Sequence, residues 1–275
     1  MQFQPEILNK ILQLKNQANI ELLQLKAELE EAKARDKLLT DLFTFLSKGW
    51  SMHFLNLADS EAERLRKMRQ ERPGEFDCLE DAYLLAKEDA EKVLKRYPSL
   101  LDQACRNNRI TLDSNSPHPK YGVKNGFFRI EIIEAKRLAK LSDYEGKLAE
   151  LAADVDAVAE MIRKEYLRVF NRKFHGPNFL KQLRASYKKI VEKKREQDGT
   201  SIPIKEITKL LRKKDKEFRM DEFIADLTNL AERGPVEIDG RIIDLQQTKD
   251  ISQGILLCGA SARGYIGFII FKEKS

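Results

Sequence analysis

The longest uninterrupted pattern in the chain occupies residues 5–48, which read PEILNKILQLKNQANIELLQLKAELEEAKARDKLLTDLFTFLSK. No proline or glycine interrupts this stretch after Pro5, and apolar residues recur at intervals of three and four, the a/d spacing of a coiled-coil heptad. This seam, as we call it, comprises Ile7, Ile11, Leu14, Ala18, Leu22, Leu25 and Leu29 and continues to Leu39 and Phe43. Two successive intervals of four around Ala18 form a stutter. The pattern predicts one long helix and a coiled-coil module over residues 1–49.

Both ends of this helix carry recognisable signals. Pro5 suits a first helical position, because its missing N–H would be unpaired there, and Gly49 is expected to end the helix. At 1.5 Å per residue the helix is about 65 Å long, too long to bury its seam against a short domain of its own chain. We therefore predict a homodimer, or a helical protein partner, that binds through Ile7, Ile11, Leu14, Leu22, Leu25 and Leu29. The alternative is a helix folded back along helices of the same chain.

Length and composition narrow the protein class. A chain of 275 residues suits two or three modules, and a charged fraction of 34% suits a protein that is partly a solvated rod. The three cysteines, Cys78, Cys105 and Cys258, are far apart, which favours a reducing compartment over a disulfide framework. The sequence shows no secretory signal and no apolar run near the roughly 18 residues of a membrane span. We expect a cytoplasmic protein with no membrane partner.

The middle of the chain, residues 50–198, reads as a helical domain with a small β-hairpin. Helices are predicted at about 78–97, 154–171 and 177–197 from their apolar spacing. Two segments near 109–133 alternate like strands, Arg109–Asp113 and Gly126–Ile133, and the turn signal Lys124-Asn125-Gly126 precedes the second. The segment from Ile133 to Lys140 reads as helical. These elements predict a mainly α (α+β) fold.

After the linker Asp198-Gly199-Thr200-Ser201 the pattern becomes helix, helix, then strands. A short extended entry that passes into a helix is expected at 202–213, a second helix at 220–233, and strands at 236–239, 240–245 and 265–271. The stretches Ser201-Ile-Pro-Ile-Lys-Glu-Ile, Asp221-Glu-Phe and Leu227-Thr-Asn-Leu-Ala-Glu-Arg-Gly234 resemble a winged helix-turn-helix domain, over about 75 residues from Ser201 to the C-terminus at 275. This resemblance implies a nucleic-acid-binding or protein-docking module.

Charge is distributed unevenly around this domain. Between Glu160 and Arg219 there are 19 Lys and Arg against 8 Asp and Glu, so the rest of the chain carries a net −5 within the total of +6. The helix that would read DNA in a winged helix is instead acidic, with Asp221, Glu222 and Asp226, and lacks side chains that read bases. We therefore expect sequence-tolerant phosphate contact with DNA or RNA. The predicted contact residues are Lys181, Arg184, Lys188, Lys189, Lys205, Lys209, Arg212, Lys213 and Arg219.

Two other functions remain open at this point. The acidic helix also suits a protein-docking adaptor, because a dimerising rod joined to a winged helix resembles subunits that partner DNA-acting ATPases or nucleases. In addition, Asp113 followed by Glu134-Ala135-Lys136 resembles the carboxylates and lysine of PD-(D/E)xK nucleases, which hold a divalent metal ion. The preferred interpretation is a non-enzymatic nucleic-acid-binding accessory protein with no cofactor and no metal.

Overall fold

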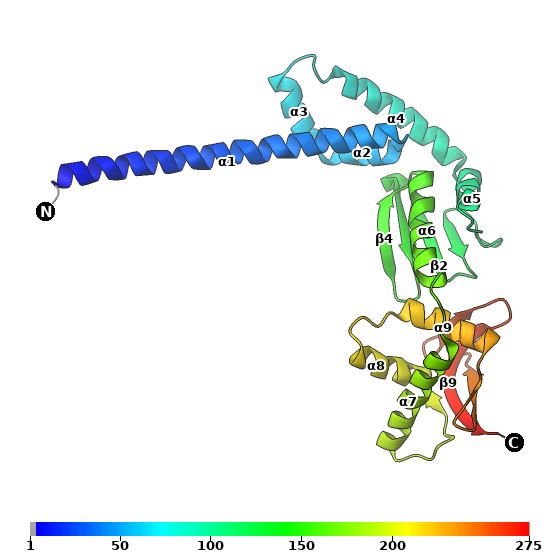
Figure 1. Cartoon of the computed structure of the whole chain (residues 1–275). Helices are drawn as coiled ribbons and strands as arrows, with labels where there is room; N and C mark the ends of the chain where they lie inside the picture. Colours follow the sequence, from blue (N-terminus) through cyan, green and yellow to red (C-terminus); the bar gives the residue numbers. More distant parts are fainter. Residues whose placement is uncertain (1–3, 275) are drawn as a thin grey trace. The chain divides into compact units, whose positions relative to one another are not determined.

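The computed structural model describes residues 4–274 (Figure 1). It forms two compact units, Met1–Ala90 and Glu91–Ser275, which we call the N-terminal and C-terminal units; helix α4 (Asp77–Lys95) crosses the division. Residues 1–3 and 275, which end the predicted ranges 1–49 and 201–275, lie outside the described residues. Helices predominate from residue 4 to 274, accompanied by two antiparallel sheets, so the prediction of a mainly α (α+β) fold is confirmed.

Helix α1 (Pro5–Ser47) dominates the N-terminal unit (Figure 1). It begins at Pro5 as predicted, and Gly49 follows it in the left-handed region with φ +67°. Its last turns bury Leu38 and Leu42, and helix α2 (Ser51–Ser60) packs against it. Helix α3 (Ala62–Glu71) is tied to α1 by an ion pair of 2.7 Å between the Arg35 guanidinium and the carboxylate of Glu71, its last residue. This end of α1 therefore belongs to a packed core.

The rest of α1 is exposed on every side. All residues from 4 to 30 are exposed, and the six predicted partner-binding side chains have exposed fractions between 46% and 71%. Phe43 continues the seam into the packed end of the helix, yet its exposed fraction is 71%. The residues that α1 buries, Leu38 and Leu42, each precede a seam position by one residue. Successive residues lie about 100° apart around a helix, so the internal contacts leave the seam from Ile7 to Leu29 and Phe43 uncovered and only half-bury Leu39.

In the C-terminal unit, helix α5 (Tyr97–Asn107) precedes a four-stranded meander of order β1-β2-β3-β4. The strands are β1 (Lys120–Val123), β2 (Phe128–Ile133), β3 (Leu138–Ser142) and β4 (Lys147–Ala152). Alternate residues of β2 are buried, with Phe128, Ile130 and Ile132 inward, as period-two alternation requires. Helix α6 (Val155–Phe170) follows and packs against α5 and β4. The sheet and both helices share one apolar core.

This sheet corrects two predictions. The partner of β2 is β1, not Arg109–Asp113, of which Leu112 makes a single bridge to Val123. A short turn pairs the strands that directly flank it, here β1 and β2. Lys124, Asn125 and Gly126 in this turn all have the positive φ that it requires. The predicted helix 133–140 is one 3₁₀ turn at Glu134–Lys136 followed by β3, because pairing with β2 outweighs local helix preference.

The last part of the unit begins with helix α7 (Gly176–Lys194), then β5 (Ile202–Pro203), α8 (Ile204–Lys214) and α9 (Met220–Arg233). The strands β6 (Glu237–Ile238), β7 (Arg241–Gln247), β8 (Ile255–Cys258) and β9 (Arg263–Glu273) complete it. The sheet order is β5-β9-β7-β6, and β8 also pairs with β9. The helices expected at 202–213 and 220–233 are present within a few residues, whereas β8 has no counterpart among the predicted strands. We call residues 176–274 the C-terminal module.

The predicted linker at 198–201 is a fixed turn inside this module. The Asp198 carboxylate accepts two hydrogen bonds from the Arg184 guanidinium of α7, at 2.7 and 2.5 Å. The Tyr187 hydroxyl donates to the carbonyl oxygen of Thr200 and accepts from the backbone N–H of Gly199. Helix α7 also packs against α8 and α9. The module therefore starts upstream of the predicted boundary at residue 201.

Candidate nucleic-acid interface

Helix α8 carries a stripe of lysines on its outer face. Its buried residues Ile204, Ile207, Thr208 and Leu211 face the module, whereas Lys205, Lys209 and Lys213 are exposed and follow at intervals of four, along one side of the helix. Neither Lys209 nor Lys213 makes an ion pair in the described part of the chain. The Lys205 ammonium donates to the carbonyl oxygen of Ser252 and remains exposed. The helix therefore presents positive charge that the chain itself does not neutralise.

Helix α7 adds a second group of cations beside α8. Lys181 and Lys189 are exposed and make no ion pair within residues 4–274, whereas Lys188 pairs with Asp239 at 3.0 Å. An ion pair of 2.8 Å between Lys194 and Glu206 joins α7 to α8. Helix α7 carries six basic residues against one acidic residue, and α8 carries five against one. The two packed helices thus form a strongly basic part of the module.

The three arginines among the predicted contact residues also have internal partners, as Lys188 does. Arg184 is 3% exposed, and its guanidinium lies over the rings of Tyr187 and Phe271 at 5.5 and 4.9 Å from their centroids. Arg212 pairs with Glu145, and Arg219 pairs with Asp221 at 3.1 Å. The prediction that Arg184 contacts phosphate is wrong in this structure, because the side chain is buried and already holds Asp198. The predicted contact residues that remain exposed without a carboxylate partner are Lys181, Lys189, Lys205, Lys209 and Lys213.

The acidic residues of α9 point to arginines of helix α6 and the turn after it. Asp221 is 2% exposed and is bound by Arg168 and Arg219, and the Arg168 guanidinium also reaches Glu222 at 3.2 Å. Arg172 donates to the Asp226 carboxylate at 2.9 Å. The three carboxylates are therefore neutralised within the chain and do not form a free acidic docking surface. The sequence signal for this contact is the spacing of Arg168 and Arg172, which are about one helical turn apart and can therefore face the same neighbouring helix.

Burial and ion pairing act in opposite directions on these carboxyl groups. Burial would raise the pKa of Asp221, but hydrogen bonds from Arg219 and Arg168 outweigh it and lower the pKa. At Asp226 burial is the larger influence, so its pKa is raised although Arg172 opposes the shift. Asp221 is thus held in its charged form, and its ion pair with Arg168 joins α9 to α6.

The residues of the nuclease hypothesis do not meet. The Asp113 carboxylate accepts hydrogen bonds from the backbone N–H groups of Asn125 and Gly126, at 2.9 and 2.7 Å, and so holds the β1–β2 turn. Glu134 follows the far end of β2 and binds His118. The strand between these positions spans about 20 Å at roughly 3.3 Å per residue. Two carboxylates so far apart cannot share one metal ion.

Two of the three cysteine thiols are buried, and the described residues form no metal-binding cluster. Among residues 4–274, no three His, Cys, Asp or Glu side chains gather closely enough to hold a metal ion. Burial raises the pKa of both the Cys105 and Cys258 thiols to about 12, so these thiols stay protonated at neutral pH. No helix in the described part of the chain has the length and apolar character needed to cross a bilayer.

Comparison with known proteins identified no relative of this chain. No family model, curated protein or solved structure matches the chain. The functional argument therefore rests on the residues and geometry described above.

Proposed function

We propose that this chain is a non-enzymatic accessory protein that binds the phosphate backbone of nucleic acid through the lysines of α7 and α8. The observation that carries the proposal is the exposed, unpaired stripe that includes Lys209 and Lys213. Lysines that track a backbone without side chains that read bases favour sequence-tolerant binding. Each phosphate contact releases condensed counterions, so affinity should fall steeply as salt rises.

The C-terminal module supports this proposal through its topology. The order α7, β5, α8 and α9 followed by strands β6 to β9, with β5 beside β9, resembles the arrangement of a winged helix. In that arrangement α9 would be the helix that enters the major groove. Because Arg168 and Arg172 occupy its carboxylates, we propose that α9 serves as an internal contact and that α8 faces the nucleic acid.

The expected result is a loss of nucleic-acid affinity when the α8 stripe is reversed in charge. Lys209→Glu with Lys213→Glu should weaken binding to random-sequence duplex by about tenfold or more near 0.1 M salt, and should lower the salt slope by about one to two. An electrophoretic mobility shift over a salt series measures both. The matched control is Lys87→Glu with Lys164→Glu, which makes the same charge change outside the module and should bind like wild type. Equal losses in the two variants would contradict a specific stripe.

The N-terminal rod supports a second part of the proposal, association of two chains along the seam of α1. Leucine and isoleucine side chains exposed along this much of a helix favour burial against another helix. A docking role as an adaptor subunit with no direct nucleic-acid contact remains the alternative. The support for this alternative is the exposed part of α1. The α9 carboxylates no longer support it, because they are paired within the chain.

Light scattering on the purified chain is expected to give twice the mass of one chain at micromolar concentration. Leu14→Glu with Leu25→Glu should reduce this to the mass of one chain, because both positions lie on the seam. Leu12→Glu with Leu23→Glu is the matched control, since these leucines are also exposed but lie off the seam. A monomeric wild type, or equal effects of the two pairs, would argue against a homodimer.

A further inference from the structure

One side of strand β7 is unpaired over its second half. Within residues 4–274, β7 has β9 on one side and β6 on the other, and β6 pairs only with Arg241 and Ile242. The last hydrogen bond on that side runs from the Ile243 N–H to the Val236 carbonyl oxygen, at 2.8 Å. Beyond it, no strand of the described chain lies beside the outer edge of β7.

The register shows which backbone groups face this edge. Residues along a strand point their N–H and C=O groups alternately to its two sides. Because the N–H of Ile243 faces outward, the N–H and C=O of Leu245 face outward as well. Thr248, three residues further, donates its N–H inward to the Tyr265 carbonyl oxygen at 2.7 Å, as the same alternation requires. Leu245 thus offers one donor and one acceptor at an open edge.

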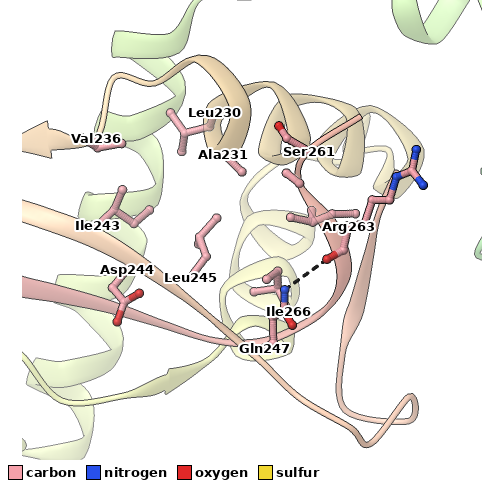
Figure 2. Close-up of a pocket in the computed structure, with 12 residues that line it drawn as sticks. Leu230, Ala231, Val236, Ile243, Asp244, Leu245, Gln247, Ser261, Arg263 and Ile266 are labelled. Carbon is pink, nitrogen blue, oxygen red and sulfur yellow. Dashed lines mark hydrogen bonds between the residues drawn. The ribbon is translucent and has the colours of Figure 1, made fainter. Parts of the chain in front are cut away.

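An apolar groove lies along this edge. It has a cavity of about 270 Å³, and its apolar lining comprises Leu230, Ala231, Val236, Ile243, Leu245, Leu257, Ala262 and Ile266. Figure 2 shows the labelled side chains around this space, contributed by α9, by the residue before β6, by β7, and by β9 and the loop before it. Val236 is 49% exposed although it is apolar. The cavity is smaller than the roughly 300–1,000 Å³ of small-molecule clefts, and so suits single side chains of a docked peptide.

The loop before β9 gives the groove a charged end. Arg263 lines the cavity, is exposed, and uses its Nε to donate to the Gly259 carbonyl oxygen at 3.0 Å. No carboxylate among the described residues pairs with it. Asp244, also in the lining, is held by Lys272 at 2.6 Å. The Glu232 carboxylate accepts the N–H of Ser261 at 3.0 Å, which fixes the loop beside Arg263 without forming an ion pair with it.

We propose that the outer edge of β7 is a β-augmentation site for a partner protein. Its occupant is one extended peptide strand that pairs with the N–H and C=O of Leu245, inserts apolar side chains beside Val236 and Ala231, and places a carboxylate on Arg263. Backbone pairing provides affinity in this mode, and the groove and the arginine provide selectivity. This site is separate from the α7–α8 stripe and does not depend on nucleic-acid binding.

The test uses the full chain and fluorescent seven-residue peptides that alternate valine and threonine and end in either aspartate or lysine. Polarisation should show binding of the aspartate peptide, with at least about tenfold weaker binding of the lysine peptide. Arg263→Glu should reverse that preference. Ala231→Trp, which fills the groove from its rim, should weaken binding by about tenfold or more, whereas Ala185→Trp on an exposed face of α7 should not.

Leu245→Pro removes the outward N–H and leaves the hydrogen bonds between β7 and β9 in place, so it should abolish binding in a folded protein. Circular dichroism checks that the fold is retained, and hydrogen exchange of the Leu245 amide in wild type should slow when the peptide is added. Undiminished binding by Leu245→Pro, or no binding of either peptide up to about 1 mM, would overturn the proposal. If Leu245→Pro instead lowers the mass measured by light scattering, the edge is occupied by a second copy and the partner proposal is wrong.

Discussion

Replacing Arg168 with methionine is expected to lower the free energy of unfolding by about 3 kcal/mol. The substitution leaves the Asp221 carboxylate, which is 2% exposed, with Arg219 as its remaining cation. Removing one partner of a buried ion pair costs about 3–5 kcal/mol, and the surviving contact with Arg219 places this case at the lower end. Urea denaturation followed by circular dichroism measures the loss, while the fluorescence of Trp50, the single tryptophan, reports on the N-terminal unit.

The matched control for this prediction is Lys164→Met on the same helix, which should change stability by less than about 0.5 kcal/mol because Lys164 is exposed. Adding Asp221→Leu to Arg168→Met should recover much of the loss, since the buried carboxylate that has lost one of its two arginines is then absent. If the double variant were as unstable as Arg168→Met alone, packing of the side chains, and not their charge, would determine the stability of this contact.

The effect of Arg168→Met should also depend on pH. Ion pairing with Arg219 and Arg168 outweighs burial and depresses the folded-state pKa of Asp221. A depressed pKa contributes stability that is present above the unfolded value of about 3.9 and is lost as pH falls through the folded value. The stability difference between wild type and Arg168→Met should therefore be full at pH 7 and shrink below about pH 4. A difference that stays constant down to about pH 2 would contradict this assignment.

Reversing the charge of Arg184 is expected to unfold the C-terminal module, with a loss of more than about 4 kcal/mol. Arg184→Glu would place a carboxylate at a position 3% exposed, beside the Asp198 carboxylate, which would lose two hydrogen bonds. It would also remove a cation from the faces of Tyr187 and Phe271. Thermal or urea unfolding followed by circular dichroism measures the loss.

Lys181→Glu is the matched control for Arg184→Glu, because it makes the same charge change three residues earlier on α7 at an exposed position. It should leave stability within about 0.5 kcal/mol of wild type while weakening nucleic-acid binding. If Arg184→Glu were as stable as wild type, Arg184 would not be needed for folding. The sequence-based prediction that Arg184 contacts phosphate, as Lys181 does, would then stand again.

Helices with long apolar periods are predictable from the sequence. The range of α1 and the positions of α6, α7 and α9 follow from spacing, from Pro5 and from the glycines and prolines between them. Strands are less predictable, because β3, β4 and β8 are short and depend on pairing with other segments. Lys147–Ala152 reads as neither helix nor strand until β3 lies beside it.

The seam of α1 is evident from the first residues, and the structure sharpens it by showing that the packed end of the helix uses a different face. Local spacing determines which side of a helix is apolar, and so the sequence alone determined the seam, and it also placed Lys205, Lys209 and Lys213 among the predicted contact residues. Whether a charged side chain is free depends on what folds against it. Only the tertiary structure could show that Arg184 is buried, that Arg168 and Arg172 neutralise α9, and that the outer edge of β7 is open, because each is decided by residues far apart in the chain.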